Sequence, residues 1–497
     1  MKSVEKWGVF EVEVKGSVDG NPFVDHHISG TFQCGQETVK ADGFYDGDGN
    51  YKVRFMPSFE GEYSYQVEAD FLAEPLSGSF QVTPPSEGNH GPVHVAWQYH
   101  FAYADATPYY SVGTTCYVWN HQSDALIEQT LASLKEAGFN KLRFCVFPKH
   151  FDYNLSEPRS YPYEGTPMDS SLLNEENFAE FNGDKGGNHF DKTRFNPEHF
   201  RHIERCILAL QKLGIEADLI MMHPYDRWGF SCMSHEEDVL YWNYAVARFA
   251  AYRNVWWSLA NEYDILKAKT LADWEGYADI LMKKDPYNHL RSIHHCFHQY
   301  DYSRPWITHC SLQRGSNQTT EYRERYGKPA VLDEMRYEGD IPWTWGNITG
   351  EEMVRRFWET AMRGGYPGHG ETYLHPDNIL WWSHGGQLHG ESWKRVKFLL
   401  DFMKQTPGHG LKLEQDQYGI LVASPELELT PVKSYYVYYF NDAQPKEYVL
   451  EIDKDTEYRV QVVDTWNMTV EEAGCHRGRM KIALPGRQYM ALRLIRN

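Results

Sequence analysis

The sequence lacks the signals of a secreted, disulfide-linked or membrane protein. Its eight cysteines form no CxxC pair, and several lie inside apolar runs such as "KLRFCVF" and "ERCILAL". We therefore expect buried free thiols in a reducing compartment. The opening stretch "MKSVEKWGVFEVEV" has no apolar signal-peptide core, and no uninterrupted apolar run approaches the ~20 residues of a membrane helix. These absences predict a cytoplasmic protein.

Positive charge is also scarce, with 49 Lys and Arg against 69 Asp and Glu and a net charge of -20. An acidic surface repels phosphate backbones and anionic lipid, so we expect no nucleic-acid partner and no membrane partner. Aromatic residues are plentiful, with 16 Trp, 34 Tyr and 25 Phe. Their flat apolar faces suit core packing and also stacking against sugar rings or bases.

The length of 497 residues predicts two to four domains, and the pattern changes twice along the chain. Residues 1–85 contain only short segments that alternate apolar and polar residues, separated by Gly, Asn and Asp. This pattern predicts an N-terminal β-sandwich of the immunoglobulin or fibronectin type. The Pro- and Gly-rich stretch "TPPSEGNHGP", residues 83–92, marks the boundary that follows.

Residues 93–408 alternate strands with helices. The expected strands are "YYSVGTTCYVW", "NKLRFCVFP", "IEADLIMMHP", "NVWWSLANE", "LRSIHHC", "WITHCSLQ", "PAVLDEM" and either "GHGETYL" or "NILWWSHGG". The expected helices are 124–137, 197–214, 235–252, 270–284, 318–326, 350–364 and 391–404. Eight βα units predict a (β/α)8 TIM barrel. The alternative is an open doubly wound sheet, which is disfavoured because no glycine-rich phosphate loop opens a helix after any strand.

Residues 410–497 return to strand patterns such as "SYYVYYF", "EYRVQVVD" and "QYMALRLI". They predict a smaller, sandwich-like C-terminal β-domain. The predicted fold is therefore multidomain, with a barrel flanked by two β-domains.

Polar residues at the ends of two expected strands are the first candidates for chemistry. The fourth strand ends in Asn261 and Glu262, and the seventh ends in Asp333 and Glu334. In a TIM barrel the active site lies at the carboxyl ends of the strands, and strands four and seven face each other across the barrel. Two opposed carboxyl groups with substrate between them are the arrangement of a retaining glycosidase.

These motifs resemble the clan of TIM-barrel retaining glycoside hydrolases with catalytic glutamates on strands four and seven. The closer resemblance is to glycosidases with an N-terminal β-sandwich of the DUF5060 type, an apiosidase-like barrel of the DUF4038 type and a C-terminal β-domain of the DUF5605 type. The segments "KWGVFEVEV", "HPYDRWGF" and "NVWWSLANEYD" carry this match, which covers nearly the whole chain.

The resemblance implies roles for four residues. Glu262 would be the acid/base and Glu334 the nucleophile, in preference to its neighbour Asp333, because strand alternation turns only one of the two inward. Asn261 would bind the sugar hydroxyl beside the anomeric centre, and Arg143 would keep the nucleophile ionised. The clan usually supplies a Tyr near the nucleophile from strand six, and "WITHCSLQR" has none.

Further polar and aromatic residues at strand ends are candidates for sugar contacts. "HPYDRWGF" suits a sugar-binding loop, and one Trp of "LWWSHGG" is expected in the sugar site with the other in the core. The histidines of "SIHHCFH" allow two interpretations, a sugar contact from His294 or His295, or a metal site. The remaining candidates are Trp119, His121, His223, Asp226, Trp228, His309, Gln313, Trp381 and Trp382.

We therefore expect an exo-acting retaining glycoside hydrolase that needs no cofactor or metal and acts on oligosaccharides or glycosides. Two alternatives are a non-catalytic carbohydrate-binding protein, which should lack one catalytic carboxylate, and a metal-dependent barrel hydrolase that uses the histidines. The identity of the sugar and the choice between monomer and homo-oligomer stay open, because loops set specificity.

Overall fold

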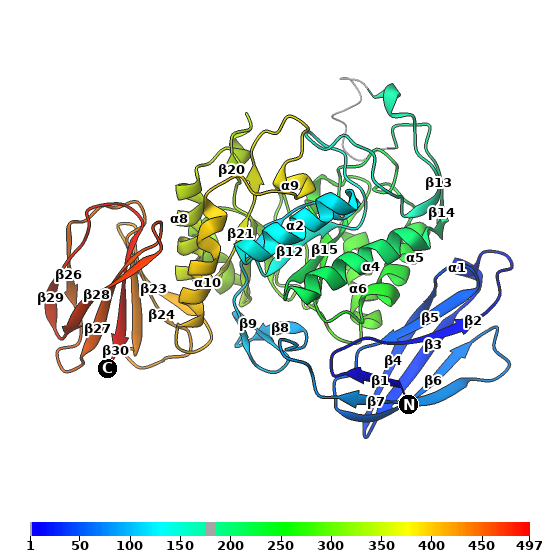
Figure 1. Ribbon diagram of the computed structural model, residues 1–497, viewed down its shortest axis with the longest axis horizontal. Coiled ribbons are helices and arrows are strands. Elements are labelled where there is room, and N and C mark those ends of the chain that lie inside the picture. The colour runs from blue at the N-terminus through cyan, green and yellow to red at the C-terminus, as the bar shows by residue number, and fades with distance from the viewer. Residues whose placement is uncertain (1, 174–183) are drawn as a thin grey trace.

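The computed structural model describes residues 2–173 and 184–497. Figure 1 shows three parts, an N-terminal sheet in blue, a central barrel wrapped by helices, and a C-terminal sheet in red. The central part lies between the other two, and the two chain ends lie on separate outer domains. The three-part organisation expected from the sequence is confirmed.

The N-terminal part, residues 2–83, is a seven-stranded sheet in the order β1-β7-β6-β3-β4-β5-β2. Phe10 on β2 stacks on Phe80 on β7 with ring centroids 3.7 Å apart. These strands lie near opposite ends of the strand order, so the sheet folds over a shared aromatic core. The elements are β1 (Lys2–Glu5), β2 (Phe10–Lys15), α1 (Pro22–Asp25), β3 (Ile28–Cys34), β4 (Glu37–Tyr45), β5 (Asn50–Phe55), β6 (Gly61–Ala69) and β7 (Leu76–Thr83).

The central part is built on eight parallel strands within its described residues, in the order β17-β16-β15-β12-β11-β21-β19-β18. A parallel bridge between His294 and Ser311 joins the two ends of this order. The sheet is therefore a closed barrel. The strands are β11 (Gly113–Thr115), β12 (Lys141–Cys145), β15 (Glu216–Met222), β16 (Val255–Ala260), β17 (Arg291–Ser292), β18 (Cys310–Gln313), β19 (Ala330–Glu334) and β21 (Tyr366–His369).

Helices follow the strands, and the longer ones cover the outside of the barrel (Figure 1). They are α2 (Asp124–Ala137), α4 (Pro197–Lys212), α5 (His235–Phe249), α6 (Leu271–Lys284), α7 (Thr319–Tyr326), α8 (Gly350–Met362), α9 (Trp381–His384) and α10 (Val396–Lys404). Residues 293–309, all described, contain no helix between the fifth and sixth strands. Of the two segments considered for the eighth strand, the first forms β21, whereas "LWWSH" begins a short helix.

Capping residues fix the helix boundaries that the sequence indicated. Ser123 accepts a hydrogen bond from the Leu126 N–H at the start of α2, and Gly138 ends the helix at φ 80°. Glycine reaches this left-handed conformation without the steric cost of a side chain. α4 begins with Asn196 as cap and Pro197 in its first turn. These signals are local, which is why the sequence predicts them well.

One small sheet covers the amino ends of the barrel strands, and two others belong to the loops between barrel strands and helices. β8 (Val93–Ala96), β9 (His100–Tyr103) and β10 (Pro108–Tyr109) form an antiparallel sheet. Its Phe101 packs on Trp256 and His309, so it covers the amino ends of the barrel strands. The other additions are the hairpin of β13 (Tyr163–Thr166) with β14 (His189–Phe195) and the pair of β20 (Glu338–Gly339) with β22 (Glu371–Thr372).

The C-terminal part has two layers around an apolar core that includes Leu450, Ile482 and Leu492. One layer is a sheet in the order β23-β24-β25-β30-β27-β28, and the other is the pair β26-β29. The strands are β23 (Leu411–Gln417), β24 (Ile420–Pro425), β25 (Tyr435–Tyr439), β26 (Glu447–Glu451), β27 (Tyr458–Asp464), β28 (Thr469–His476), β29 (Arg479–Ala483) and β30 (Met490–Arg496).

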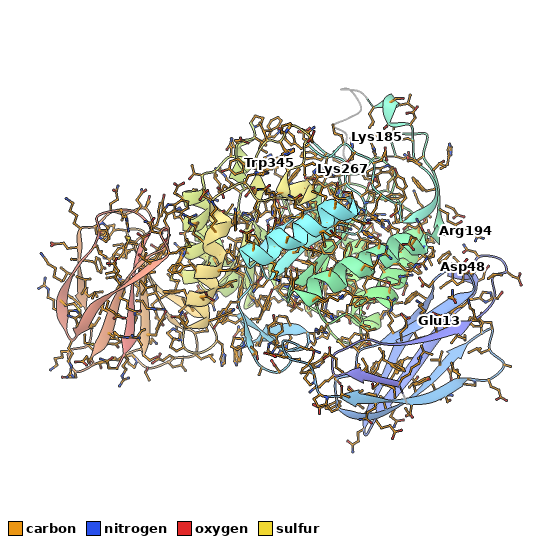
Figure 2. The ribbon with its side chains drawn as sticks, viewed as in Figure 1. Glu13, Asp48, Lys185, Arg194, Lys267 and Trp345 are labelled. Atoms are coloured by element: carbon orange, nitrogen blue, oxygen red, sulfur yellow. The ribbon has the colours of Figure 1, made fainter. Side chains whose placement is uncertain are left out.

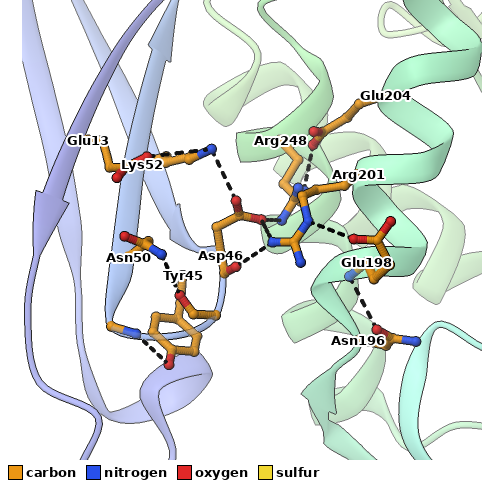
Figure 3. Close-up of polar contacts among 12 residues, drawn as sticks. Glu13, Tyr45, Asp46, Asn50, Lys52, Asn196, Glu198, Arg201, Glu204 and Arg248 are labelled. Atoms are coloured by element: carbon orange, nitrogen blue, oxygen red, sulfur yellow. Dashed lines mark hydrogen bonds and ion pairs between the residues drawn. The ribbon is translucent and has the colours of Figure 1, made fainter.

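The N-terminal sheet is held to the barrel by a buried network of charges (Figure 3). Arg54 on β5 and Arg248 on α5 both bind Glu204 on α4, at 2.7 Å and 2.6 Å. Arg248 also reaches Asp46, which follows β4, at 2.8 Å. Positive and negative groups alternate across the interface, so each buried charge has a partner of opposite sign.

The eight cysteines are all free thiols, as expected, but they are not all buried. Cys116, Cys145, Cys206 and Cys310 are buried, whereas Cys232 and Cys475 are exposed. In the described part of the chain, no helix has both the length and the apolar character needed to cross a membrane.

Candidate active site

A cavity of about 570 Å³ opens at the carboxyl ends of the barrel strands. In Figure 2, Trp345 of its lining and Lys267, which follows β16, lie on the same side of the barrel. The lining residues are Tyr117, Lys149, Phe151, Tyr225, Glu262, Cys296, Phe297, Gln313, Arg314, Gly315, Glu334, Met335, Arg336, Tyr337, Trp345, Arg356 and Trp382. Both glutamates singled out in the sequence are among them.

Glu262 follows β16 directly and is buried. Its backbone is left-handed, with φ 52° and ψ 56°, which is uncommon for a residue with a side chain and is often found at functional sites. The Tyr225 hydroxyl donates a hydrogen bond to its Oε2, and Asn261 Nδ2 donates to the same oxygen at 3.2 Å. The Cys296 thiol also hydrogen-bonds this carboxyl group.

Glu334 ends β19 and is buried on the other side of the cavity. The Tyr117 hydroxyl donates to its Oε1, and Arg143 Nη1 donates to the same oxygen at 3.0 Å. Arg143 lies on β12, and Tyr117 follows β11 by two residues. No described residue donates a hydrogen bond to Oε2 of Glu334, which leaves that oxygen for the cavity.

The neighbouring carboxylate, Asp333, points away from this site. Its Oδ1 is 2.5 Å from Lys141 Nζ, which also binds Asp218 at 2.8 Å. Ser311 Oγ donates to the other oxygen of Asp333 at 2.5 Å. Lys141 and Arg143 lie two residues apart on one face of β12, so their partners Asp333 and Glu334 both lie on the inner side of the barrel. The register between β18 and β19 shifts at this point, and Glu334 is the one of the two that lines the cavity.

Glu262 and Glu334 have different electrostatic surroundings. Burial raises the pKa of Glu262 to about 7, and the charge of Glu334 adds to this rise, while Tyr225 and Lys149 oppose it. Glu334 is instead paired with the guanidinium of Arg143 at 3.0 Å. A carboxyl group with a pKa raised to about 7 thus shares the cavity with one that forms an ion pair.

Asn261 connects the two groups. Its Oδ1 accepts hydrogen bonds from Arg143 Nη2 at 2.8 Å and from Tyr117 Oη at 3.3 Å. Its Nδ2 donates to Glu262. The amide therefore fixes the position of Glu262 relative to the cluster around Glu334.

Lys149 places a buried cation between these groups. Its Nζ lies 3.5 Å from the ring centroid of Tyr117, 4.3 Å from that of Tyr225 and 4.7 Å from that of Trp382. Such contacts attract a cation but do not replace hydrogen-bond acceptors. Among the described residues the ammonium has no hydrogen-bond or ion-pair partner, and burial lowers its pKa to about 8.

His294 and Gln313 complete the polar surface near Glu334. His294 Nε2 lies 3.9 Å from Glu334 Oε1, and neither ring nitrogen has a hydrogen-bond partner in the described chain. Burial, with the charge of Arg143, lowers the pKa of His294 well below its usual range, so the ring is neutral. Gln313 pairs with Glu334 between β18 and β19, and its buried Oε1 also lacks a partner among described residues.

Five sequence candidates on the early loops lie away from the cavity, and their placement is a correction. Trp119 packs in the core against Phe144, and His121 stacks on His199. Both belong to a short 3-10 helix that turns outward after Tyr117. In "HPYDRWGF", His223 contacts the Phe147 carbonyl, Asp226 accepts from the loop's own backbone, and Trp228 packs against Phe230.

Three later candidates also lie elsewhere. His309 precedes the first residue of β18 and packs at the closed amino end of the barrel, against Phe101 and Trp256. His295 contacts the Tyr302 hydroxyl, whereas His294 faces Glu334. Trp381 donates to Thr114 Oγ1 in the core, whereas Trp382 lines the cavity. In each adjacent pair, one residue faces the cavity and its neighbour points elsewhere.

The sequence interpretation missed several cavity residues, namely Tyr117, Lys149, Tyr225, Cys296 and Tyr337. Tyr117 and Tyr225 stand in the two loops from which other residues were chosen. Tyr117 supplies the phenol that the clan takes from strand six. Lys149 follows the second strand in "FPKH", and an ordinary surface lysine would give the same pattern.

The histidines of "SIHHCFH" do not assemble as a metal site in the described structure. The one group of His, Cys, Asp and Glu side chains close enough to share a cation among described residues is Glu338, His369 and Glu371. That group lies outside the cavity lining.

Comparison with known proteins places the central part among the catalytic domains of glycoside hydrolases. A candidate glycoside hydrolase from Bacteroides vulgatus ATCC 8482 is 37% identical, with 100% of both chains covered and a TM-score of 0.91. A glycoside hydrolase family 5 structure from the same organism shares the fold at 15% identity, with a TM-score of 0.59 over 82% of this chain and 94% of that chain. A search among curated proteins found no match.

The family model described as "Apiosidase-like, catalytic domain" matches residues 96–406. Two domain families of unknown function match the flanking parts, DUF5060 over residues 3–70 and DUF5605 over residues 426–495. The apiosidase-like model covers more than half of the chain. The chain therefore belongs to the apiosidase-like family.

Proposed function

We propose that this protein is a retaining glycoside hydrolase with Glu334 as nucleophile and Glu262 as acid/base. The observation that carries the proposal is the pair of buried carboxyl groups in one cavity, one raised in pKa to about 7 and one paired with Arg143. Two such groups on either side of a sugar are what double displacement needs.

The hydrogen bonds support these two roles. Tyr117 and Arg143 both contact Oε1 of Glu334, so Oε2 is available to attack the anomeric carbon. Tyr225 and Asn261 both donate to Oε2 of Glu262, so Oε1 can carry the proton that passes to the leaving oxygen. Glu262 then takes a proton from water, which releases the sugar from Glu334.

The remaining polar groups suit sugar hydroxyls. His294 and Gln313 have buried polar atoms without a hydrogen-bond partner in the described chain. The Lys149 ammonium lies among aromatic rings, and Trp382 supplies an aromatic face. A compact cavity of about 570 Å³ suits the end of a sugar chain, which supports exo action. The family name makes apiosides the first glycosides to test, beside glucosides, galactosides, mannosides and arabinosides.

The test compares Glu334→Ala and Glu262→Ala in the presence of azide, on a substrate found by screening nitrophenyl glycosides. In Glu334→Ala, azide takes the place of the nucleophile, so a glycosyl azide of inverted configuration should form. In Glu262→Ala, azide attacks the glycosyl-enzyme, so the azide product should keep the substrate configuration. NMR of the wild-type reaction should show release of the sugar with retained configuration.

Near wild-type hydrolysis by Glu334→Ala would rule out its role as nucleophile. Initial release of the inverted sugar by the wild type would rule out double displacement. Glu236→Ala, at an exposed carboxylate on α5, is the control and should react as the wild type does.

A further inference from the structure

Three buried side chains with metal-binding groups meet behind the wall of the cavity. Glu338 lies on β20, His369 ends β21, and Glu371 lies on β22. One potential ligand atom of each lies within 4.8 Å of those of the other two, and all three side chains are 0% exposed. Glu338 and Glu371 are directly paired between the two short strands.

His369 offers a free nitrogen. Its Nδ1 lies 2.9 Å from Thr114 Oγ1, and its Nε2 is buried with no hydrogen-bond partner in the described chain. A ring held through one nitrogen by an oxygen, with the other nitrogen free, is the usual arrangement of a metal-binding histidine.

The two carboxyl groups have no ion-pair partner among the described residues. Glu371 accepts one backbone N–H at each oxygen, from His389 at 2.5 Å and from Gly390 at 2.8 Å. This leaves a lone pair on each oxygen. Within the described residues, neither Glu371 nor Glu338 forms an ion pair with Lys, Arg or His. Buried carboxylates normally have a cationic partner or bind a metal.

Glu338 is already held by four neutral donors. They are the Glu391 N–H at 2.7 Å, the Ser392 N–H at 3.0 Å, the Tyr373 hydroxyl at 3.1 Å and the Ser392 hydroxyl at 2.5 Å. The Tyr373 contact is the longest of the four, and that hydroxyl can rotate to release Oε1. The chain also closes tightly around this group, since a Cβ on Gly390 would lie 2.5 Å from the Glu338 carboxyl carbon.

We propose that Glu338, His369 and Glu371 bind a divalent transition-metal cation such as Zn²⁺ or Mn²⁺. Two carboxylates and one imidazole suit these ions, whereas Ca²⁺ and Mg²⁺ prefer oxygen ligands alone. The cation would join the segments that follow the seventh and eighth barrel strands. Tyr337, next to Glu338, lines the catalytic cavity, so the site is structural support for that wall.

A shared proton is the competing explanation. Burial raises the pKa of Glu371 to about 8, with the charge of Glu338 adding to the rise, so without a cation one carboxyl group would be neutral near pH 7. A bound cation reverses this, because it stabilises both carboxylates in their ionised form. The two states differ in metal content and in their response to a chelator.

The experiment measures the metal content of the intact protein by mass spectrometry, together with its Tm, and needs no sugar substrate. We expect about one equivalent of metal after loading with Zn²⁺ or Mn²⁺ and gel filtration. A chelator should lower Tm by about 2 °C or more, and added Zn²⁺ or Mn²⁺ should restore it. His369→Gln and Glu371→Gln should lose the stoichiometric metal and the sensitivity to chelator.

His294→Gln is the matched control, because it removes a buried histidine from the catalytic cavity and should keep the metal. Less than a tenth of an equivalent of metal in wild-type protein, with a Tm unchanged by chelator and by added Zn²⁺ or Mn²⁺, would overturn the proposal in favour of the shared proton. Metal retained by Glu371→Gln and lost by His294→Gln would place the cation in the cavity instead. Neither result depends on glycosidase activity.

Discussion

At the residue scale, a few hydrogen bonds give the two cavity glutamates different properties. Glu334 shares one oxygen between a phenol and a guanidinium, whereas Glu262 contacts a phenol, an amide and a thiol in a buried setting. Burial, with the charge of Glu334 beside it, raises the pKa of Glu262, whereas Glu334 lies in an ion pair with Arg143. Two chemically identical side chains can therefore differ in acid–base behaviour, as the proposed roles of acid/base and nucleophile require.

The raised pKa of Glu262 sets a pH dependence. The group must be protonated to assist departure of the leaving group, so kcat/KM should fall as pH rises through about 7. In Glu262→Gln this alkaline decline should disappear, because the amide does not titrate. Activity should survive mainly on substrates with activated leaving groups. Profiles of kcat/KM against pH on activated and unactivated glycosides would check this, and equal loss on both would contradict the assignment.

Lys149 should contribute to function at a cost in stability. Lys149→Met removes a buried ammonium that lacks an acceptor in the described chain, so Tm should rise. If the ammonium binds a sugar hydroxyl, kcat/KM should fall by roughly 10- to 150-fold, the value of a charged hydrogen bond. Lys267→Met, at an exposed cation after β16, should change neither quantity. A fall in Tm without loss of kcat/KM would show a purely structural lysine.

At the element scale, parallel strands bring residues from distant parts of the chain to one place. Lys141 on β12 binds Asp218 on β15 and Asp333 on β19 inside the barrel. One residue further along β19, Glu334 enters the cavity. The buried ion cluster therefore lies next to a carboxyl group of the cavity, and the register shift between β18 and β19 occurs where the two meet.

Removing the cation of this cluster should destabilise the barrel strongly. Lys141→Met leaves Asp218 and Asp333 buried without their partner, which should lower the free energy of unfolding by about 3–5 kcal/mol. Denaturant titration measures the change. Lys283→Met, which breaks an exposed pair with Asp279 on α6, should cost less than about 0.5 kcal/mol. A similar small cost for both would show that the barrel does not depend on the cluster.

The elements also show where sequence patterns succeed. Helices α2 and α4 match their expected bounds closely, because caps and apolar periodicity are local signals. "LWWSH" was considered for a strand and begins a helix, because a short apolar run has no distinguishing period. His309 was placed at the wrong end of its strand for a similar reason, since the run does not show where pairing begins.

At the scale of the whole molecule, buried ion pairs hold the N-terminal sheet to the barrel. Glu204 binds both Arg54 and Arg248, and all three are buried. Figure 3 shows Glu204 and Arg248 beside Asp46 of the N-terminal part. Because removing one member of this buried network leaves the opposite charges incompletely paired, the two parts are expected to unfold as one unit.

Glu204→Gln should therefore weaken the junction between the two parts. Two buried guanidinium groups lose their shared anion, so we expect a loss of about 3–5 kcal/mol and faster proteolysis between residues 83 and 93. Glu198→Gln, which breaks exposed pairs on the same helix, should change little. Scanning calorimetry and limited proteolysis would check both variants, and identical behaviour would argue against an energetically coupled interface.

The sequence by itself determined the order of the three parts, the bounds of helices such as α2 and α4, and the two glutamates at strand ends. These features depend on residues close together in the chain, namely the apolar periodicity, the helix caps and the order of the strands. Only the tertiary structure decided which neighbour of each adjacent pair enters the cavity. It also decided that Tyr117 replaces the missing phenol, that Lys149 is buried among aromatic rings, and that Glu338, His369 and Glu371 meet. The physical reason is that burial, pKa and hydrogen-bond partners depend on groups brought together from distant parts of the chain.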